Sequence, residues 1–435
     1  MKYRFYNAYV VTVNDFDEIF ESGEVWVENE QITYVGRAKK DAEFLGFEQI
    51  DCGGDMLIPG FVNSHAHLPM TVLRGVGDER DFNGWWTENV RPIEVQFTEE
   101  DCYWSSLLGI AEMLEGGTTS ALSMYFKEAG TIDAFKASKM RGVVAIKIHN
   151  MLPLEESEKD FEERFNEVEK GCDLITYFVQ SHSIFSTDEP WLNLCTKMAK
   201  KHKLPQTIHL AETLGEVGEC DKENGMSPVA YLENIGFFDY PTVIAHGVYV
   251  DKDDMEILRN NNVQVAINMS SNLKLGSGIA PIKAYQNSKV KLSLATDSAS
   301  SNNSLDMFKE MYLASVVTKA VLNDASVVQA REVLRMATRG GAQALFIADR
   351  VGQLKQGYKA DIVRVSVDGL NWQPNNNKIS NLVYAATKRD VTMTMVNGKI
   401  LYNNGKFFLG ESIERIKEKC SHIVKRINGG KAIIE

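Results

Sequence analysis

Eight short apolar runs, separated mostly by amphipathic segments, occupy the middle of this chain. Apolar runs that alternate with helical segments predict βα units, and eight such units imply a closed barrel of parallel strands. We therefore predict an α/β fold with a (β/α)8 TIM-like barrel over residues 57–347. Its strands are expected at 57–65, 117–125, 141–148, 174–181, 205–210, 242–246, 262–269 and 290–296.

The segments between these runs differ in how clearly they predict helices. Thr98 and Asp101 have the spacing of a capping box, with Asp in place of the usual Glu. Residues 68–97 show no clear period, so we expect an elaborated loop over the mouth of the barrel. Helices are expected at 98–114, 187–202, 251–261 and 304–320, and another near 326–346.

The two ends of the chain lack this alternation and are rich in short strand patterns. Residues 1–56 and 348–410 are therefore predicted to pack together as one small, discontinuous β-sandwich domain. A hairpin turn is expected at 28–30, and Asn397-Gly398 is a strong hairpin signal. Residues 411–435 should form a C-terminal amphipathic helix and tail.

Charge and cysteine usage narrow the class of partner. The formal net charge is −12 and no block of Lys or Arg is present, so we expect neither nucleic acid nor membrane as a partner. The six cysteines show no Cys-x-x-Cys spacing, and no apolar stretch resembles a signal peptide or a membrane span. We predict a cytoplasmic protein that acts on a small molecule; homo-oligomer formation stays open.

Four of the predicted strands end in side chains that can bind a metal ion. His65 and His67 are one residue apart, so on a strand they project to the same side. His209, His246 and Asp297 each close another apolar run. Because the carboxyl ends of barrel strands share one face, we expect these five side chains to meet there.

Three imidazoles and one carboxylate suit one divalent cation, most simply Zn²⁺, with Fe²⁺ or Mn²⁺ as alternatives. The predicted ligands are His65, His67, His209 and Asp297. Zinc lowers the pKa of a bound water to about 7, so hydroxide becomes available as a nucleophile near neutral pH. His246 is an alternative fourth nitrogen ligand.

The remaining polar residues at the strand ends suggest acid–base roles in hydrolysis. Glu212 follows His209 by three residues and can protonate a ring nitrogen as water attacks the neighbouring amino-bearing carbon. His246 can hydrogen-bond the nucleophile, and Asp297 can relay its proton to departing ammonia. In the alternative reading, Glu212 only pairs with a lysine or caps a helix.

Several ordered motifs carry a resemblance to a known family. The chain resembles the amidohydrolase superfamily, in the branch of methylthioadenosine and S-adenosylhomocysteine deaminases and related triazine chlorohydrolases. The match runs nearly from end to end, and its order makes it specific for this branch. The matching stretches are 59–67, 73–75, 92–94, 116–119, 209–213, 271–281, 296–297 and 301–308.

The resemblance implies a zinc-dependent hydrolytic deaminase of a purine and adds three substrate-binding residues. Glu94 would bind the ribose hydroxyls, His182 would contact the nucleoside, and Trp86 with its neighbour Trp85 would line the apolar end of the pocket. Members that accept homocysteine are expected to carry arginine near the end of strand 3, where this chain has Lys147. We therefore expect methylthioadenosine, deoxyadenosine or adenosine to be preferred over S-adenosylhomocysteine.

Two alternatives remain from the sequence. The same machinery could deaminate a guanine-like or pterin-like ring, or dehalogenate a triazine. A barrel that only binds a ligand without turnover is the other alternative, and it would be favoured if a predicted ligand or Glu212 were missing; all are present.

Overall fold

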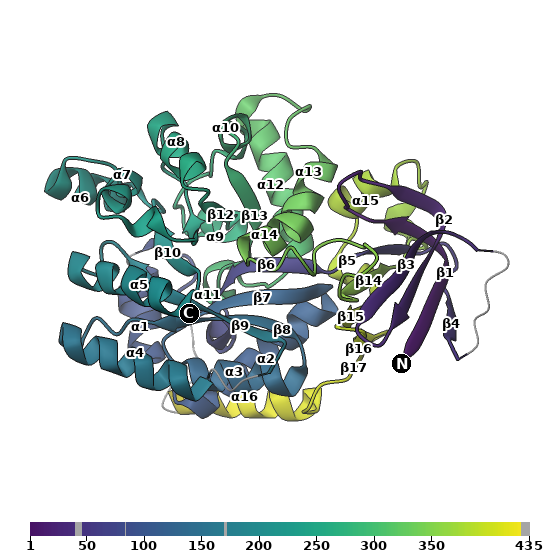
Figure 1. Cartoon of the computed structure of the whole chain (residues 1–435), viewed down its shortest axis with the longest axis horizontal. Helices are drawn as coiled ribbons and strands as arrows, with labels where there is room; N and C mark the ends of the chain where they lie inside the picture. The colour runs from purple at the N-terminus through teal and green to yellow at the C-terminus, as the bar shows by residue number, and fades with distance from the viewer. Residues whose placement is uncertain (40–45, 83, 169–171, 428–435) are drawn as a thin grey trace.

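The computed structural model of the protein describes residues 1–39, 46–82, 84–168 and 172–427. Eight parallel strands follow one another in sheet order from β6 to β13, as expected for successive βα units (Figure 1). A parallel bridge between Ala66 and Asp297 joins the first strand to the end of the last. The sheet is therefore closed, and the predicted (β/α)8 barrel is confirmed.

The barrel strands agree with the predicted runs in place and order. Their apolar side chains fill the barrel interior with a cluster that includes Val62, Leu122, Val143 and Phe178. The strands are β6 (Phe61–Ala66), β7 (Thr118–Met124), β8 (Arg141–Lys147), β9 (Ile175–Ser183), β10 (Gln206–Leu210), β11 (Thr242–His246), β12 (Gln264–Ile267) and β13 (Lys291–Leu294).

The predicted first strand, 57–65, was wrong at its start. Residues Met56–Pro59 form β5, which pairs with β1 and β14 in the other sheet, and β6 begins only at Phe61. Gly60 separates the two strands, and a Cβ at this position would overlap the side chain of Thr119. The predicted strand passed through Pro59-Gly60, which is a turn signal, and the chain changes sheet at the glycine because no side chain fits there.

Helices surround the barrel, and the predicted capping box is present. The Thr98 hydroxyl accepts the Asp101 N–H at 3.2 Å, and the Asp101 carboxylate accepts the Thr98 N–H at 2.7 Å. The helices of the barrel are α2 (Glu99–Glu115), α3 (Glu128–Ser138), α4 (Leu154–Val168), α5 (Glu189–His202), α6 (Leu214–Asn224), α7 (Pro228–Asn234), α8 (Lys252–Asn260), α9 (Met269–Lys274), α10 (Ile282–Asn287), α11 (Ala299–Asn302), α12 (Met307–Leu322), α13 (Ala330–Arg335) and α14 (Gly341–Ala344).

Strands from both ends of the chain lie side by side in a nine-stranded sheet (Figure 1). The predicted turns are confirmed, because 28–30 joins β2 to β3 and Asn397-Gly398 joins β15 to β16. Both residues of the second turn have positive φ, 50° and 74°, as a tight hairpin requires. The strands are β1 (Lys2–Val11), β2 (Ile19–Glu28), β3 (Gln31–Arg37), β4 (Glu48–Asp51), β5, β14 (Ile362–Val365), β15 (Val391–Val396), β16 (Lys399–Asn403) and β17 (Lys406–Phe407).

Two regions differ in detail from the expected pattern. The segment 68–97 contains η1 (Leu68–Leu73), η2 (Gly84–Val90) and α1 (Arg91–Glu94), where the sequence predicted only a loop. η2 and α1 follow one another without a break, but η2 is a π-helix and does not keep the 3.6-residue period that predicts a helix. The short helix α15 (Lys378–Tyr384) was likewise not predicted.

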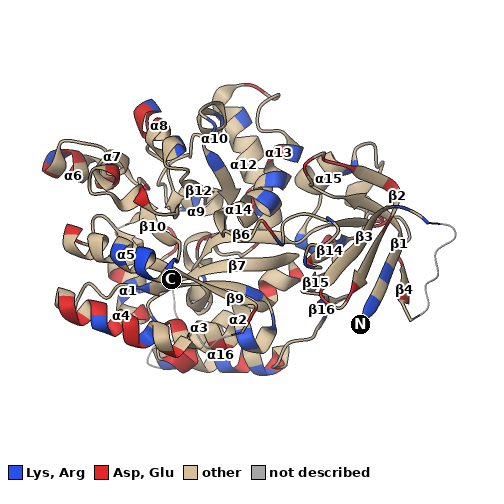
Figure 2. Cartoon of the chain, in the orientation of Figure 1, with Lys and Arg blue, Asp and Glu red and all other residues tan. Residues whose placement is uncertain are grey.

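The C-terminal helix α16 (Ile413–Ile427) packs against the barrel through Ile416, Cys420 and Ile423, as its amphipathic pattern predicted. Acidic and basic residues are interspersed along its outer face and along α4 (Figure 2). Among the helices of the described residues, none is both long and apolar enough to cross a membrane.

Candidate metal centre and active site

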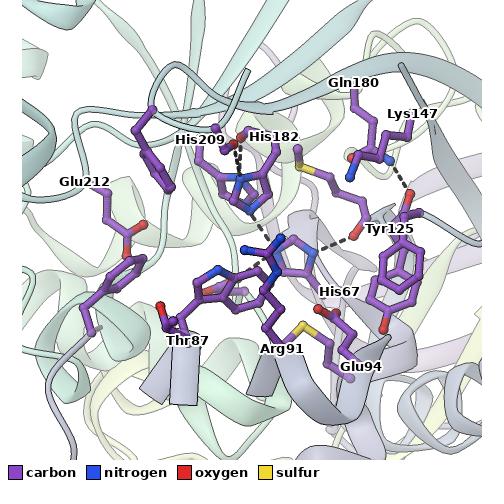
Figure 3. Close-up of a pocket in the computed structure, with 18 of the residues that line it drawn as sticks. His67, Thr87, Arg91, Glu94, Tyr125, Lys147, Gln180, His182, His209 and Glu212 are labelled. Atoms are coloured by element: carbon purple, nitrogen blue, oxygen red, sulfur yellow. Dashed lines mark hydrogen bonds and ion pairs between the residues drawn. The ribbon is translucent and has the colours of Figure 1, made fainter. Parts of the chain in front are cut away.

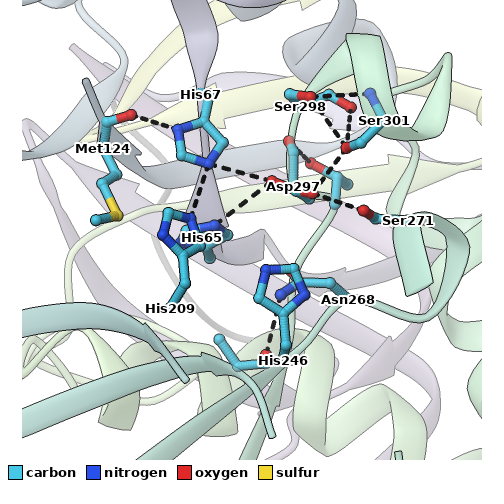
Figure 4. Close-up of polar contacts among 12 residues, drawn as sticks. His65, His67, Met124, His209, His246, Asn268, Ser271, Asp297, Ser298 and Ser301 are labelled. Atoms are coloured by element: carbon cyan, nitrogen blue, oxygen red, sulfur yellow. Dashed lines mark hydrogen bonds and ion pairs between the residues drawn. The ribbon is translucent and has the colours of Figure 1, made fainter. Parts of the chain in front are cut away.

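Five polar side chains from four strands converge at one end of the barrel (Figure 4). His65 projects from β6, His209 from β10 and His246 from β11, while His67 follows β6 and Asp297 follows β13. All five are buried or nearly so. The structure therefore brings together the four predicted ligands and the predicted base-like histidine.

The spacing of the donor atoms fits one divalent metal ion. His67 Nε2 lies 3.2 Å from Asp297 Oδ1 and 3.2 Å from His209 Nε2, and His65 Nε2 lies 3.5 Å from Asp297 Oδ1. Donor atoms in a tetrahedron with metal–ligand distances near 2.1 Å would be about 3.4 Å apart. His65, His209 and His246 form a second close group, so the geometry alone leaves His246 open as a ligand.

The environment of His65 points to a metal in the same way. Its side chain is fully buried, and among the described residues neither ring nitrogen makes a hydrogen bond, while Nε2 lies 3.5 Å from Asp297 Oδ1. A buried imidazole without a partner is costly, because its polar atoms have lost their water. A cation at the convergence point would supply a partner for Nε2, the ring nitrogen that faces Asp297.

Two backbone carbonyls fix the tautomers of the neighbouring imidazoles. His67 Nδ1 lies 2.5 Å from the carbonyl oxygen of Met124, and His209 Nδ1 lies 2.7 Å from that of His182. A carbonyl can only accept, so both Nδ1 atoms carry the proton and both Nε2 atoms keep a lone pair for the ion.

The carboxylate of Asp297 is held by two serines from two short helices, α9 and α11. Ser271 Oγ and Ser301 Oγ donate to Asp297 Oδ2 at 2.6 and 2.7 Å (Figure 4). These bonds occupy one oxygen and leave Oδ1 directed at His65 and His67. Ser271 and Ser301 lie in the motifs that carried the family resemblance, but their roles could not be read from the sequence.

Glu212 and His246 form a second polar pair next to the histidine cluster. Glu212 Oε2 lies 3.5 Å from His246 Nε2, and Ser277 Oγ donates to Glu212 Oε1 at 3.2 Å. Burial is the largest effect on Glu212 and raises the pKa of its carboxyl. The His246 ring is held from its other side by Asn272, whose Oδ1 lies 2.8 Å from Nδ1.

A cavity of about 670 Å³ opens over these residues and contains the predicted substrate-binding residues (Figure 3). Trp86 stacks on His182 with ring centroids 5.7 Å apart and an interplanar angle of 17°. Glu94 is buried in the wall, and burial raises its pKa. Figure 3 shows Glu212 on one side of the cavity and Glu94 on the other.

Two cationic side chains, Lys147 and Arg91, also line the cavity. The sequence did not predict Arg91 as a site residue. Lys147 comes from the end of β8 and Arg91 from α1. Burial lowers the pKa of Lys147, while the charges of Glu94 and Glu128 act in the opposite direction. Arg91 could not be found from the sequence, because it reaches the cavity only through the short helices of segment 68–97.

A closed barrel with this donor set at its strand ends is the architecture of a metal-dependent hydrolase, and comparison with known proteins supports that class. The model of the amidohydrolase family matches residues 56–401. The chain is 34% identical to a 5-methylthioadenosine/S-adenosylhomocysteine deaminase of Acetivibrio thermocellus over 97% of this chain and 98% of the relative. It is 36% identical to a protein of the same name from Bacillus cereus, over 93% and 95%. The chain belongs to the amidohydrolase family.

Solved structures agree with this assignment. An adenosine deaminase from Xanthomonas campestris with bound zinc has a TM-score of 0.91 and 29% identity, with 98% of each chain covered. An atrazine chlorohydrolase from Arthrobacter aurescens complexed with zinc has a TM-score of 0.88 over 97% of this chain and 99% of the other. At 21% identity the second likeness shows the fold alone. The converging donor atoms are thus spaced to hold a divalent metal ion, in a fold that holds zinc in this adenosine deaminase.

Proposed function

We propose that this protein is a hydrolytic deaminase that replaces the exocyclic amino group of an adenine nucleoside with oxygen and releases ammonia. The observation that carries the proposal is the Glu212–His246 pair, 3.5 Å apart, beside the metal-binding cluster inside a large cavity. Deamination by water needs an activated nucleophile and a proton donor for the ring, and this arrangement offers both.

We infer that His65, His67, His209 and Asp297 hold one Zn²⁺. When bound, such an ion supplies Lewis acidity that brings the pKa of a water to about 7. The tautomers set by Met124 O and His182 O support this ligand set, because they leave the Nε2 atoms unprotonated.

The protein's own residues then move the protons. Glu212, whose pKa is raised by burial, donates its proton to the ring nitrogen beside the carbon that water attacks. His246 accepts a hydrogen bond from that water through Nε2. Asp297 Oδ1 takes one proton of the water and passes it to the amino group, which leaves as ammonia. The second water proton restores Glu212 as the carbonyl forms, so atoms and charge balance.

The cavity walls support a ribosylated adenine as substrate. Glu94 can accept hydrogen bonds from two adjacent ribose hydroxyls, and the stacked pair Trp86 and His182 offers a flat surface and a ring nitrogen. Met151 and Phe185, which line the outer part of the cavity and are exposed, suit an apolar substituent such as a methylthio group. Methylthioadenosine, deoxyadenosine and adenosine are the substrates we favour.

S-adenosylhomocysteine ranks lower, although the relatives' names include it. Lys147 is a point charge without the bidentate fork of arginine, and Glu94 and Glu128 already act on it. Arg91 is the second cation that could face a carboxylate, so the rank of this substrate depends on these two side chains.

Two further features fit a small-molecule enzyme of the cytoplasm. All six cysteines are free, and five of them are buried, as a reducing compartment allows. Acidic and basic residues are mixed over the outer helices seen in Figure 2, which supports neither nucleic acid nor membrane as the partner.

The direct test is ammonia release by zinc-loaded protein from methylthioadenosine, adenosine, 5′-deoxyadenosine, S-adenosylhomocysteine, guanine and a chlorotriazine, with chloride release measured for the last. Release confined to the ribosylated adenines is the expected result. Ammonia release from guanine alone, or chloride release from the triazine alone, would show that the proposed substrate class is wrong. The protein would still be a metal-dependent hydrolase. If none of these compounds is turned over, the alternative of a barrel that binds a ligand without catalysis is favoured.

A further inference from the structure

Glu216 is a buried carboxylate behind Glu212 that the reaction described above does not use. It lies in the first turn of α6 and is 5% exposed. Its Oε1 accepts the N–H of Ala211 at 3.0 Å, and its Oε2 accepts the N–H of Glu212 at 2.8 Å. Both oxygens therefore bind the backbone that carries the proposed proton donor.

The backbone held by Glu216 is an unusual turn. Ala211 has φ of 52°, in the left-handed region that residues with a Cβ rarely adopt. Its carbonyl oxygen accepts the N–H groups of Val248 and Tyr249, at 2.9 and 3.0 Å, from the loop after β11. The turn links the end of β10 to α6 and points the Glu212 side chain into the cavity (Figure 3). Hydrogen bonds from several directions are what maintain such a conformation.

The simpler explanation is that Glu216 only caps helix α6. Its hydrogen bonds, however, differ from those of a capping box. Thr213 is the N-cap of α6, and its hydroxyl accepts the Glu216 N–H at 3.2 Å. In a capping box the residue at position N3 returns its side chain to the N–H of the N-cap. Asp254 does this in α8, where it accepts the N–H of Asp251 at 3.2 Å. Glu216 instead reaches past Thr213 to the two residues before it.

We propose that Glu216 is a positioning residue for Glu212. It holds the left-handed turn at Ala211 through two adjacent N–H groups, and this fixes where the Glu212 carboxyl stands relative to His246. The inference rests on the proposed function, because it takes Glu212 as the proton donor. It assigns a role to a side chain that does not line the cavity.

The test compares Glu216→Gln and Glu216→Ala with the wild type for kcat, KM, metal content and melting temperature. Gln keeps one acceptor oxygen and Ala keeps none, so the loss should be graded. We expect kcat to fall by about tenfold for Gln and about a hundredfold for Ala, the loss that a catalytic group misplaced by about 1 Å produces. KM should change by less than about threefold, with metal content unchanged, because neither the ligands nor the substrate-binding wall is altered.

The matched control is Asp254→Asn, which disturbs a buried capping carboxylate on α8. It should lower the melting temperature without lowering kcat. If the Glu216 variants lose stability while kcat stays at the wild-type value, Glu216 is only a cap and the proposal is wrong.

A crystal structure of Glu216→Gln separates this inference from the proposed function. A displaced Glu212 side chain supports the positioning role even if the wild type deaminates none of the panel compounds, in which case only the reaction assignment fails. An unmoved Glu212 in an otherwise ordered structure overturns the positioning role, whatever the substrate proves to be.

Discussion

His246 and Asn272 are joined by a 2.8 Å contact between the imidazole Nδ1 and the amide Oδ1. An amide oxygen only accepts, so Nδ1 carries the proton and Nε2 presents its lone pair toward Glu212. Asn272 does not line the cavity among the described residues, yet it determines which nitrogen of His246 can act there. The tautomer of an active-site histidine is thus set by a residue behind it.

Replacing Asn272 with alanine should therefore lower kcat by about 10- to 100-fold, because His246 would lose its fixed tautomer and orientation. Metal content should stay at the wild-type value, since the hydrogen bond that is lost is made to His246 and not to one of the four predicted ligands. Steady-state kinetics and zinc analysis on the same preparation check this. Asn193→Ala, an exposed position on α5, is the control and should leave kcat unchanged.

Replacing Glu212 with glutamine should reduce kcat by about 10²- to 10⁴-fold, because glutamine cannot transfer a proton to the ring nitrogen. Zinc stoichiometry should remain that of the wild type. A variant that lost its metal together with its activity would show that Glu212 holds the ion, directly or through its neighbours, and the acid role would be withdrawn.

Metal content tests whether His246 is a ligand, because His65 belongs to both close groups of donor atoms and His246 to one of them. His65→Ala should lose the ion, because His65 is a predicted ligand, is fully buried and makes no hydrogen bond among the described residues. His246→Ala should keep the ion while kcat falls, because Asn272 and Glu212 occupy its surroundings. Elemental analysis measures the zinc content of both variants. Loss of zinc from His246→Ala would show that His246 is the fourth nitrogen ligand.

Removing the cations of the cavity should change substrate preference. In Lys147→Met and Arg91→Met, the ratio of kcat/KM for S-adenosylhomocysteine to that for methylthioadenosine should fall, because only the former carries a carboxylate. A loss of about tenfold per charge-assisted contact is expected. An equal loss of kcat/KM for both substrates would mean that these residues support the fold of the cavity and do not bind the carboxylate.

The convergence of the predicted ligands could be predicted from the sequence, because the relevant signals are local. A His-x-His pair places both rings on one face of a strand, and a metal-binding residue at a strand end needs only the apolar run before it. Glu216 and Asn272 carry no such signal, because their partners are a backbone turn and a ring from another part of the fold. For β5, Pro59-Gly60 signals a break in the chain, but the sequence does not show that the strand before it pairs with β1 and β14 in the other sheet.

Glu310 offers a test of electrostatics away from the metal ligands. It is fully buried on α12, where it accepts the Ser270 N–H at 3.1 Å and the Asn302 amide at 2.9 Å. Burial raises the pKa of its carboxyl from 4.5 to about 7. Between these values the native state binds more protons at this site than the unfolded state, so the contribution of Glu310 to stability is present below pH 4.5 and is lost as pH rises through about 7.

The free energy of unfolding of the wild type should therefore fall relative to that of Glu310→Gln, by up to about 3 kcal/mol, between pH 4.5 and pH 8. Glutamine resembles the protonated acid in shape and cannot ionise, so the difference between the two proteins isolates this group from all others that titrate. Urea unfolding at a series of pH values measures it, with the exposed Glu418→Gln as a control that should show a much smaller change. A difference that is flat across this range would mean that Ser270 and Asn302 stabilise the ionised carboxylate enough to cancel its burial.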